Sequence, residues 1–349
     1  MTIQDIYQLA IKLGIQNDFR GAKEIEHLLE KRKKNYEKLS KKEKEVYDPE
    51  NLTNPFSDTR ILYPDFATSY AQGYGRSKKA STFDKSSVDR SSGKPEGYNK
   101  PVRRMLVGID IGPEEIMLAK QLGGFDLVMS HHPSGKALAG LDEVMHLQAD
   151  VLAQYGVPIA VAQSLLKPRI EEVSRGISPS NHNRTVDVAK LLDVSYLCVH
   201  TPSDNMVAQY LKHKIEKANP KYVSELMEFL FDIPEYREAA KIKAGPKLFA
   251  GSPEHHCGKI ALTELTGGTE GTPQIYERLA QAGISTIVGM HLSEKHTESA
   301  KNAHINAIIA GHMSSDSIGM NLFIDQLEKK GIEIIPVGGF IRISRNKSK

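Results

Sequence analysis

The part of the chain after Pro101 alternates short apolar runs with stretches of helical spacing, and this alternation constrains the fold most strongly. Strands that alternate with helices pair mainly in parallel, and the helices pack on the faces of the sheets. The sequence therefore predicts an α/β fold with mixed, largely parallel sheets and helices on both faces. The predicted strands are 105–109, 125–130, 158–162, 196–199, 259–265, 284–288, 305–310 and 332–337. The predicted helices are 113–122, 141–155, 185–192, 272–282, 293–302 and 314–329, with a helical insertion at about 205–245.

The first hundred residues have a different texture, and we expect them to form an N-terminal helical extension (1–100) to an α/β domain at 101–349. Residues 3–45 have apolar side chains at helical spacing, and residues 58–63 read as a short strand. Residues 73–100 contain few large apolar side chains, which predicts a mobile loop. The basic run from Lys31 to Lys34 is interleaved with acidic residues, and this favours a solvated helix face over RNA binding.

Composition excludes several classes of protein. No apolar run approaches the roughly 18 residues that a bilayer span requires, and the first apolar positions are spaced as one helix face rather than as a secretory signal. Two cysteines in 349 residues exclude a disulfide framework and fit a reducing cytoplasm. With 46 basic and 43 acidic residues, the chain has no strong nucleic-acid signature. We therefore expect a cytoplasmic protein that binds neither membranes nor nucleic acid.

Four of the predicted strands run into a histidine, namely His131, His200, His291 and His312. In open α/β sheets, ligands bind outside the carboxyl ends of the strands. Histidine is the commonest metal ligand and a frequent proton carrier. A single histidine at a strand end is more often a capping or hydrogen-bonding group, but four such positions together favour a shared site.

His200 and His312 are each followed, four residues later, by an aspartate. Positions four apart lie on one face of a helix, so each imidazole and the carboxylate that follows it can point into the same cavity. The alternative is that Asp204 and Asp316 are first-turn carboxylates favoured by the helix dipole. Taken alone, the spacing leaves both interpretations open.

The adjacent pair His131 and His132, followed by Pro133, favours a metal site over the capping interpretation. Adjacent strand residues point in opposite directions, so a histidine pair suits two neighbouring ions better than one small centre, provided the chain turns. Pro133 restricts His132 to extended conformations and ends the strand. Nitrogen and oxygen donors without thiolate favour zinc, iron or manganese, and nothing in the sequence selects among these three.

These motifs together resemble the NIF-three-like family, whose bacterial members are often labelled type 2 homologues of GTP cyclohydrolase I. The resemblance rests on Met105-Leu-Val-Gly-Ile-Asp110, Ser130-His-His-Pro133, His200-Thr-Pro-Ser-Asp204 and Gly311-His-Met-Ser-Ser-Asp316, which occur in the family's order. It spans roughly residues 105–337. The His-His-Pro turn and the late Gly-His are its specific part.

The resemblance implies two divalent metal ions held by five side chains, namely His131, His132, Asp204, His312 and Asp316. Asp316 is a departure, because the family usually has glutamate at this position. An aspartate is shorter by one methylene group, so a bridging role for Asp316 requires its helix to approach the metals more closely.

Two further histidines have expected roles, the first of them from the resemblance. His296 matches a family histidine near the pocket, where it would act as an acid or base beside the metals. The alternative for His296 is a helix N-terminal residue in contact with solvent. His200 is expected to orient Asp204 or a bound water.

Two other motifs offer weaker signals. The loop 267–271 follows a strand and precedes a helix, so it can cradle an anion, although a plain tight turn is favoured. The motif His255-His256-Cys257 has no matching partner pair elsewhere, and a loop is favoured there over a metal cluster.

Two functional classes fit these expectations. The first is a metal-dependent hydrolase of a small nucleotide-like, phosphorylated or heterocyclic substrate, with GTP known only from the family label. The second is a non-catalytic metal-binding regulatory or scaffold protein, favoured if the aromatic side chains between Tyr47 and Tyr74 contact a partner rather than the protein's own core. The resemblance alone also implies a homo-oligomer, typically a hexamer built as a ring of dimers.

Overall fold

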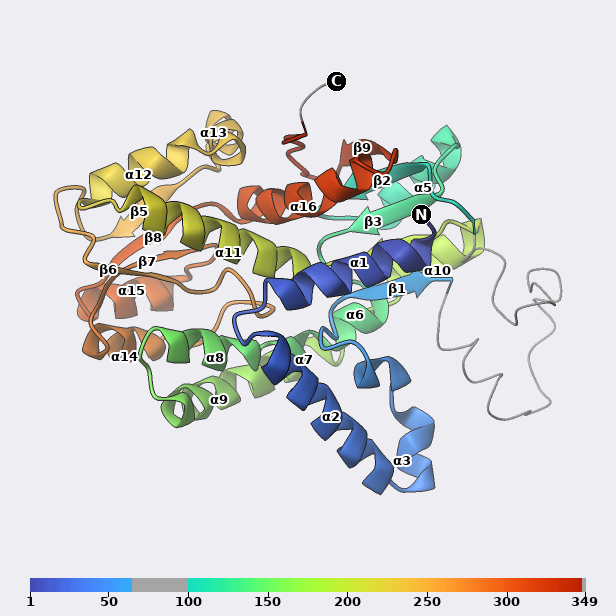
Figure 1. Ribbon diagram of the computed structural model, residues 1–349, viewed down its shortest axis with the longest axis horizontal. Coiled ribbons are helices and arrows are strands. Elements are labelled where there is room, and N and C mark those ends of the chain that lie inside the picture. Colours follow the sequence, from blue (N-terminus) through green and yellow to red (C-terminus); the bar gives the residue numbers. More distant parts are fainter. Residues whose placement is uncertain (65–99, 347–349) are drawn as a thin grey trace.

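Two separate β-sheets form the framework of the molecule (Figure 1). The computed structural model describes residues 1–64 and 100–346. Across the first sheet the strands are β1 (Arg60–Tyr63), β4 (Tyr196–Cys198), β3 (Leu127–Ser130), β2 (Arg104–Gly108) and β9 (Glu333–Val337). Across the second they are β5 (Lys247–Ala250), β8 (Asn306–Ile309), β7 (Ile284–Gly289) and β6 (Lys259–Leu262). Neighbours are parallel except at one edge of each sheet, where β1 runs antiparallel to β4 and β5 to β8, which confirms the predicted mixed, largely parallel pairing.

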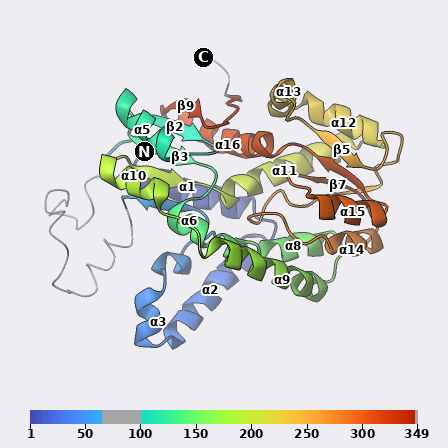
Figure 2. The same ribbon diagram turned by 180° about the vertical axis from the view of Figure 1, so that it is seen from behind.

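Helices surround the two sheets, as Figures 1 and 2 show from opposite sides. The N-terminal helices are α1 (Ile3–Gln16), α2 (Ala22–Lys38), α3 (Lys41–Val46) and the 3-10 turn η1 (Pro49–Leu52). The middle of the chain forms α5 (Pro113–Leu122), α6 (Gly135–Ala139), α7 (Leu141–Val144), α8 (Leu147–Gln154), α9 (Ile159–Ile177) and α10 (Arg184–Leu192). The remaining helices are α11 (Thr201–Ala218), α12 (Val223–Asp232), α13 (Pro234–Lys241), α14 (Ile275–Gln281), α15 (Glu294–Asn302) and α16 (His312–Glu328).

Both faces of each sheet are buried, because successive residues of a strand point to opposite sides. In β2, Met105 and Val107 pack with α1 and α16, whereas Leu106 packs on the other face with α5 and α10. In β7, Ile287 packs with α8, α9 and α14, and Val288 packs on the other face with α11 and α12. The predicted arrangement of helices on both faces is therefore confirmed.

Helices α11 and α16 connect the two halves of the molecule, and they pack against each other. Residues of α16 enter the core of the first sheet through Phe323 and Leu327, and the core of the second through Ile318. Residues of α11 likewise join both cores, through Met206 and Leu211. Because both helices begin at strand ends, their first turns lie where the two sheets approach each other.

The predicted strand at 158–162 is wrong, because this segment begins helix α9. Ala162, Leu166, Ile170 and Val173 form the buried face of that helix, at spacings of three and four residues. The short apolar run after Pro158 is the first turn of this longer pattern, and such runs do not by themselves distinguish strand from helix. The sequence reasoning also missed the edge strand β5.

The first 64 residues contribute to the first sheet and its core. Ile6 and Ile11 of α1 are buried against that sheet, as is Phe56, which lies just before β1. Phe56 therefore packs in the protein's own core rather than on a partner. The predicted mobile loop, apart from Lys100, and the aromatic residues beyond 64 lie outside the described residues, and the boundary at residue 100 stays a prediction.

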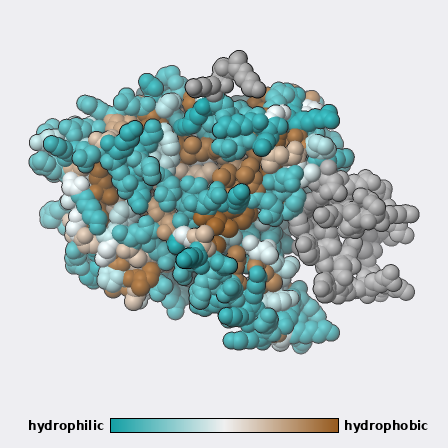
Figure 3. Space-filling view, viewed as in Figure 1, coloured by the Kyte–Doolittle hydropathy of each residue, from teal (hydrophilic) through white to brown (hydrophobic). Residues whose placement is uncertain are grey.

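The surface of the described residues is mostly hydrophilic in Figure 3, with a hydrophobic area near the centre of that view. In Figure 1 this area corresponds to the region of α1, α11 and α16. Among residues 1–64 and 100–346, no helix combines the length and apolar character that crossing a membrane requires. Both cysteines, Cys198 and Cys257, are free and buried.

Candidate metal centre

Strand ends from both sheets bring five histidines into one cluster. The imidazole centroids of His131 and His200, which follow β3 and β4, are 4.7 Å apart. The His132 ring lies 5.2 Å from that of His312, which opens α16 after β8 of the second sheet. The ring of His291, after β7, is 4.4 Å from that of His312. The four strand-end positions singled out in the sequence therefore lie side by side.

The turn after β3 directs two successive imidazoles into this cluster. The amide N–H groups of His131 and His132 donate to the carbonyls of Gly108 and Ile109, both at 2.9 Å, so the pairing with β2 extends to the turn. The two rings are 5.2 Å apart and tilted by 48°. Their Nε2 atoms approach different oxygens of Asp316, from His131 at 3.5 Å and from His132 at 3.3 Å.

Helices α11 and α16 place the two carboxylates between the imidazoles. Asp204, in the first turns of α11, lies 3.3 Å from His131 Nε2 through Oδ1. Asp316, one turn into α16, faces His131 through Oδ1, and through Oδ2 it faces both His132 and His312, the latter at 3.4 Å. The shorter aspartate thus reaches both sides of the cluster, because α16 starts directly at the strand end.

The donor atoms form overlapping groups that can hold metal ions. In each group, one ligand atom per residue lies within 4.8 Å of the others. One group contains His131, Asp204 and Asp316, a second contains His132, His312 and Asp316, and a third contains His131, His132 and His200. All five sequence-predicted ligands are therefore brought together, and Asp316 is shared by the first two groups.

The buried carboxylate oxygens in this cluster lack hydrogen-bond partners. Both oxygens of Asp316 and Oδ1 of Asp204 are buried and accept no hydrogen bond, although imidazole nitrogens lie 3.3–3.5 Å away. A first-turn carboxylate that caps its helix would accept from backbone amides, which Asp316 does not. Burying an uncompensated carboxylate costs several kcal/mol, so the donor set fits a cation.

Each of three imidazoles is held from behind through Nδ1, which leaves Nε2 pointing inward. Nδ1 of His131 lies 3.1 Å from the carbonyl of Val199, which can only accept, so this nitrogen carries the hydrogen. Nδ1 of His132 lies 2.6 Å from Asp110, and Nδ1 of His200 lies 2.7 Å from Asp58. Metal-binding histidines typically have such a partner behind the ring, because it fixes the tautomer that offers a bare nitrogen.

The imidazoles and carboxylates of the cluster shift one another's pKa values. Burial disfavours the charged form of His131, but the carboxylates of Asp316 and Asp204 outweigh it and raise its pKa well above the usual value. Burial of His132 is likewise outweighed by its hydrogen bond to Asp110 and by the nearby carboxylate of Asp316, and its pKa rises to about 9. The same imidazoles outweigh burial of Asp316 and hold its pKa well below the usual value. Positive charge between the carboxylates is thus favoured, whether protons or metal ions supply it.

His291 is buried differently from its neighbours. Burial, followed by the nearby charge of His312, lowers the pKa of His291 to about 4, so this ring is neutral at neutral pH. Its Nδ1 is buried without a hydrogen-bond partner. Burial also lowers the pKa of His312. His291 therefore borders the cluster as a neutral imidazole.

Among the described residues, the contacts of His296 are with a different set of side chains. Its Nδ1 lies 2.7 Å from Ser293 Oγ and 3.3 Å from Glu270, and its Nε2 lies 3.9 Å from Glu264. His296 is 3 % exposed, so it is not a solvent-facing helix end. Its predicted role as an acid or base beside the metals stays a prediction.

The contacts of the two weaker motifs hold loops in place. In the loop 267–271, Gly267 and Gly268 have φ of +91° and +90°, as a tight turn requires. The carbonyls of Gly267 and Thr269 accept hydrogen bonds from Gln148. His255 pairs with Asn306, and within the described part of the chain the motif at 255–257 belongs to no metal-binding group.

Sequence reasoning missed two acidic residues that support the cluster. Asp58 lies just before β1, and its carboxylate accepts from His200 and from the amide and hydroxyl of Thr201. Asp110 follows β2 directly, and this strand-end position is the signal that could have identified it. Asp58 gave no such signal, because it precedes its strand. It reaches the site because β1 is antiparallel to β4, so the start of β1 lies at the carboxyl end of β4.

Comparisons with known proteins identify structural relatives. A scan of family models gives no match, and a search of curated proteins gives none either. A NIF3 superfamily protein from Sphaerobacter thermophilus is similar in structure, with a TM-score of 0.63 and 28 % sequence identity over 68 % of this chain and 87 % of that one. Reduced HcgD from Methanocaldococcus jannaschii gives a TM-score of 0.42 and 16 % identity, over 68 % of this chain and 84 % of that one. On the similarity to the Sphaerobacter protein, together with the fold and the ordered strand-end motifs, this chain belongs to the NIF3-like family.

Proposed function

We propose that the chain binds two divalent metal ions at this cluster and acts as a metal-dependent hydrolase on a small nucleotide-like, phosphorylated or heterocyclic substrate. One ion would be held by His131, Asp204 and Asp316, and the other by His132, His312 and Asp316. A single observation carries the proposal, namely the Asp316 carboxylate. It is buried, neither of its oxygens has a hydrogen-bond partner, and imidazoles face it on both sides.

The donor set limits the identity of the metals. All five side chains offer nitrogen or oxygen, and the two free cysteines are not among the metal-binding groups of the described residues. Such ligands favour zinc, iron or manganese over softer ions. Two neighbouring divalent ions would supply an activated water and stabilise negative charge that develops on a carbonyl or phosphoryl oxygen.

The protein side chains define how a substrate can reach the centre. His131, Asp204 and Asp316 have side chains that are at most 3 % exposed, whereas those of His132 and His312 are 27 % and 40 % exposed. A substrate would therefore approach from the side of His132 and His312. His291 lies beside His312 and is neutral at neutral pH, so it can orient a water or a substrate oxygen without adding charge.

Metal content of the purified full-length protein tests the metal-binding part of this proposal. We expect His131→Ala and Asp316→Asn each to carry fewer metal equivalents than the wild type, with a loss of about two if the ions bind cooperatively. His213→Ala is the matched control, because His213 is an exposed histidine of α11 outside the cluster. Metal content in both cluster variants equal to that of the control would contradict the proposal.

Turnover tests the catalytic part. The metal-loaded wild type is assayed against a panel of nucleotides and model phosphoesters, together with His131→Ala and His213→Ala. We expect hydrolysis that the control retains and His131→Ala loses. Full metal loading without turnover across the panel would instead support the non-catalytic regulatory or scaffold role.

Two statements about the whole protein extend the proposal. We propose a homo-oligomer, a hexamer by family resemblance, and sedimentation at micromolar concentration measures its mass. A monomer under those conditions would contradict this assembly. A cytoplasmic location stays a prediction from the cysteine content.

A further inference from the structure

A second cluster of potential metal ligands lies at the ends of β6 and β7, apart from the first. Glu264 comes two residues after β6, Glu270 lies in the following loop, and His296 is in the first turn of α15. One ligand atom from each of these residues lies within 4.8 Å of the others. None of the three belongs to the groups around Asp316.

The inward-facing atoms of this cluster are buried and have no hydrogen-bond partner. Both carboxylate oxygens of Glu264 and Nε2 of His296 are in this state, and each side chain is 4 % exposed. Nε2 lies 3.9 Å from the Glu264 carboxylate, which is too far for a hydrogen bond. An unpaired buried carboxylate beside an unpaired imidazole nitrogen leaves two strong donors to a cation unused.

Arg169 does not form an ion pair with Glu264. Nε of Arg169, on α9, donates to the backbone carbonyl of Glu270 at 3.1 Å. One of its terminal nitrogens pairs with Glu172 at 3.0 Å. The guanidinium is therefore directed at the loop backbone and at its own helix. Among the described residues, no lysine or arginine lies in ion-pair range of the Glu264 carboxylate, and His296 Nε2 is 3.9 Å away.

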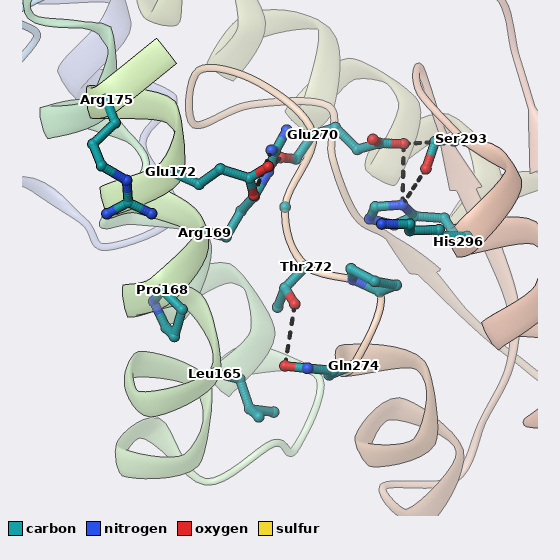
Figure 4. A pocket seen from close by; sticks show the side chains of 13 residues that line it. Leu165, Pro168, Arg169, Glu172, Arg175, Glu270, Thr272, Gln274, Ser293 and His296 are labelled. Carbon is teal, nitrogen blue, oxygen red and sulfur yellow. Dashed lines mark hydrogen bonds and ion pairs between the residues drawn. The ribbon is translucent and has the colours of Figure 1, made fainter. Parts of the chain in front are cut away.

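The other side of the His296 ring is held in place. Nδ1 lies 2.7 Å from Ser293 Oγ, and the Glu270 carboxylate accepts the backbone N–H of Ser293 at 2.6 Å while lying 3.3 Å from Nδ1. Figure 4 shows Glu270, Ser293 and His296 joined in this way. A hydrogen on Nδ1 that points to Ser293 Oγ leaves the lone pair of Nε2 free to face Glu264. Only Oε1 of Glu270 takes part in the contacts with Ser293 and Nδ1, so its other oxygen is left as a ligand atom.

The cluster opens onto a cavity. Glu270 and His296 line a cavity of about 410 Å³ between α9, the loop 270–274 and α15. In Figure 4 the side chains of Arg169, Glu172 and Arg175 border it from α9. The cavity therefore borders two of the three members of the cluster, whereas Glu264 is buried behind them.

We propose that Glu264, Glu270 and His296 bind a third divalent transition-metal ion, separate from the pair proposed at Asp316. Two carboxylates and one imidazole are the ligand types that zinc, iron and manganese accept, and the cavity leaves the remaining coordination positions to water or to a ligand. The assignment goes beyond the proposed hydrolase function, because the two sites share no ligand.

Metal stoichiometry of the full-length protein tests this site. After removal of bound metal, each protein is dialysed against Zn²⁺ at fixed free concentration. We expect Glu264→Gln and His296→Ala each to bind one equivalent fewer than the wild type. Glu172→Gln is the matched control, because Glu172 lines the same cavity but is not in the cluster. Both cluster variants binding as much Zn²⁺ as the control would overturn the proposal.

The variant Asp316→Asn separates this test from that of the first centre. We expect it to lose equivalents at the first centre while still losing one more when His296→Ala is added. If Asp316→Asn binds as many equivalents of Zn²⁺ as the wild type, the proposal for the first centre is wrong. The loss of Zn²⁺ on adding His296→Ala to Asp316→Asn still tests the second cluster.

A direct measurement on the wild type covers the case in which a variant does not fold. Crystals grown with Zn²⁺ should give an anomalous peak at the zinc edge between Glu264 and His296. A peak at Asp316 with none between Glu264 and His296 would overturn the third site.

Discussion

At the scale of single residues, the candidate metal centre depends on acceptors that lie behind the imidazoles. The carboxylates of Asp110 and Asp58 and the carbonyl of Val199 contact Nδ1 of His132, His200 and His131, respectively. These contacts select the tautomer in which Nε2 is free, and they fix the orientation of each ring. The orientation of these imidazoles is therefore set by residues outside the proposed ligand set.

Asp58 is the strongest test of this dependence. It is fully buried, and hydrogen bonds from His200 and Thr201 outweigh that burial and hold its pKa below the usual value. We expect Asp58→Asn to weaken metal binding by about 10–100-fold, because His200, which shares a potential metal-binding group with His131 and His132, loses the carboxylate that orients it. Competition with a chromophoric chelator measures the dissociation constant.

The matched control for Asp58→Asn is Asp232→Asn, because Asp232 is an exposed aspartate at the end of α12 and belongs to none of the potential metal-binding groups. It should leave metal affinity unchanged. If the two variants bind metal equally well, Asp58 does not support the centre. A thermal melt of both metal-free variants separates loss of stability from loss of affinity.

The sequence could predict the proposed ligands of this centre but only part of their support, because Asp110 follows a strand end whereas Asp58 does not. His131, His132 and His312 were recognisable because parallel strands end at one edge of a sheet. Asp58 belongs to a strand that joins this sheet antiparallel from a distant part of the chain. Nothing in the local pattern around residue 58 encodes that pairing, so its role required the structure.

At the scale of secondary-structure elements, the close contact between α11 and α16 sets the distance between the two carboxylates. Gly319 of α16 lies directly against Ser203 of α11, and a Cβ at residue 319 would lie 2.3 Å from the Ser203 carbonyl oxygen. Ser203 precedes Asp204, and Gly319 lies three residues after Asp316. Any separation of these helices therefore moves the two carboxylates apart.

We expect Gly319→Ala to destabilise the protein by about 1–3 kcal/mol, because the added methyl group meets backbone that cannot move without shifting a helix. It should also weaken metal binding, since Asp204 and Asp316 would be displaced. Chemical denaturation of the metal-free protein gives the free energy of unfolding, and metal titration gives the affinity.

Gly176→Ala is the control for this substitution. Gly176 lies inside α9, and a Cβ there would meet no atom within 4 Å. Alanine at this position should raise stability by roughly 0.5–1 kcal/mol through helix propensity alone. Equal effects of the two substitutions would show that the α11–α16 contact is not tight.

The elements themselves were mostly predictable, and the exceptions have a common physical cause. Helix α5 and the buried strands β2 and β3 were recognisable from apolar periodicity and from Pro113 at the helix start. Segment 158–162 was ambiguous because four small and branched apolar residues suit either element. The buried positions that define α9 continue to Val173, and only that longer stripe shows the helical period.

At the scale of the whole molecule, the candidate centre lies where two sheets meet. Strands of the first sheet supply His131, His132 and His200, and the second sheet supplies His291 and His312. Neither sheet has the full ligand set, so the centre forms only when both halves are folded and joined through α11 and α16. The order of elements along the chain predicted the sheets, but not that their carboxyl ends would face each other.

The N-terminal segment is part of this assembly in the structure. Ile3, Ile6, Tyr7 and Ile11 of α1 are each at most 6 % exposed, and they pack in the same core cluster as Val107 and Leu197 of the first sheet. Burying such side chains stabilises a protein by about 1.5–3 kcal/mol each. Their combined contribution is of the order of the net stability of a whole domain, about 5–15 kcal/mol.

We therefore expect residues 101–349 alone not to form a stable copy of this fold. Removing residues 1–100 would expose the face of the first sheet that α1 covers, leave β4 as an unpaired edge and take Asp58 away from His200. Thermal unfolding followed by circular dichroism compares the shortened and full-length chains. Adding residues 1–64 as a separate fragment should restore part of the lost stability, because the contacts of α1 and β1 with the remainder need no peptide connection. Cooperative unfolding of 101–349 within a few degrees of the full-length protein would instead make the first hundred residues an independent extension.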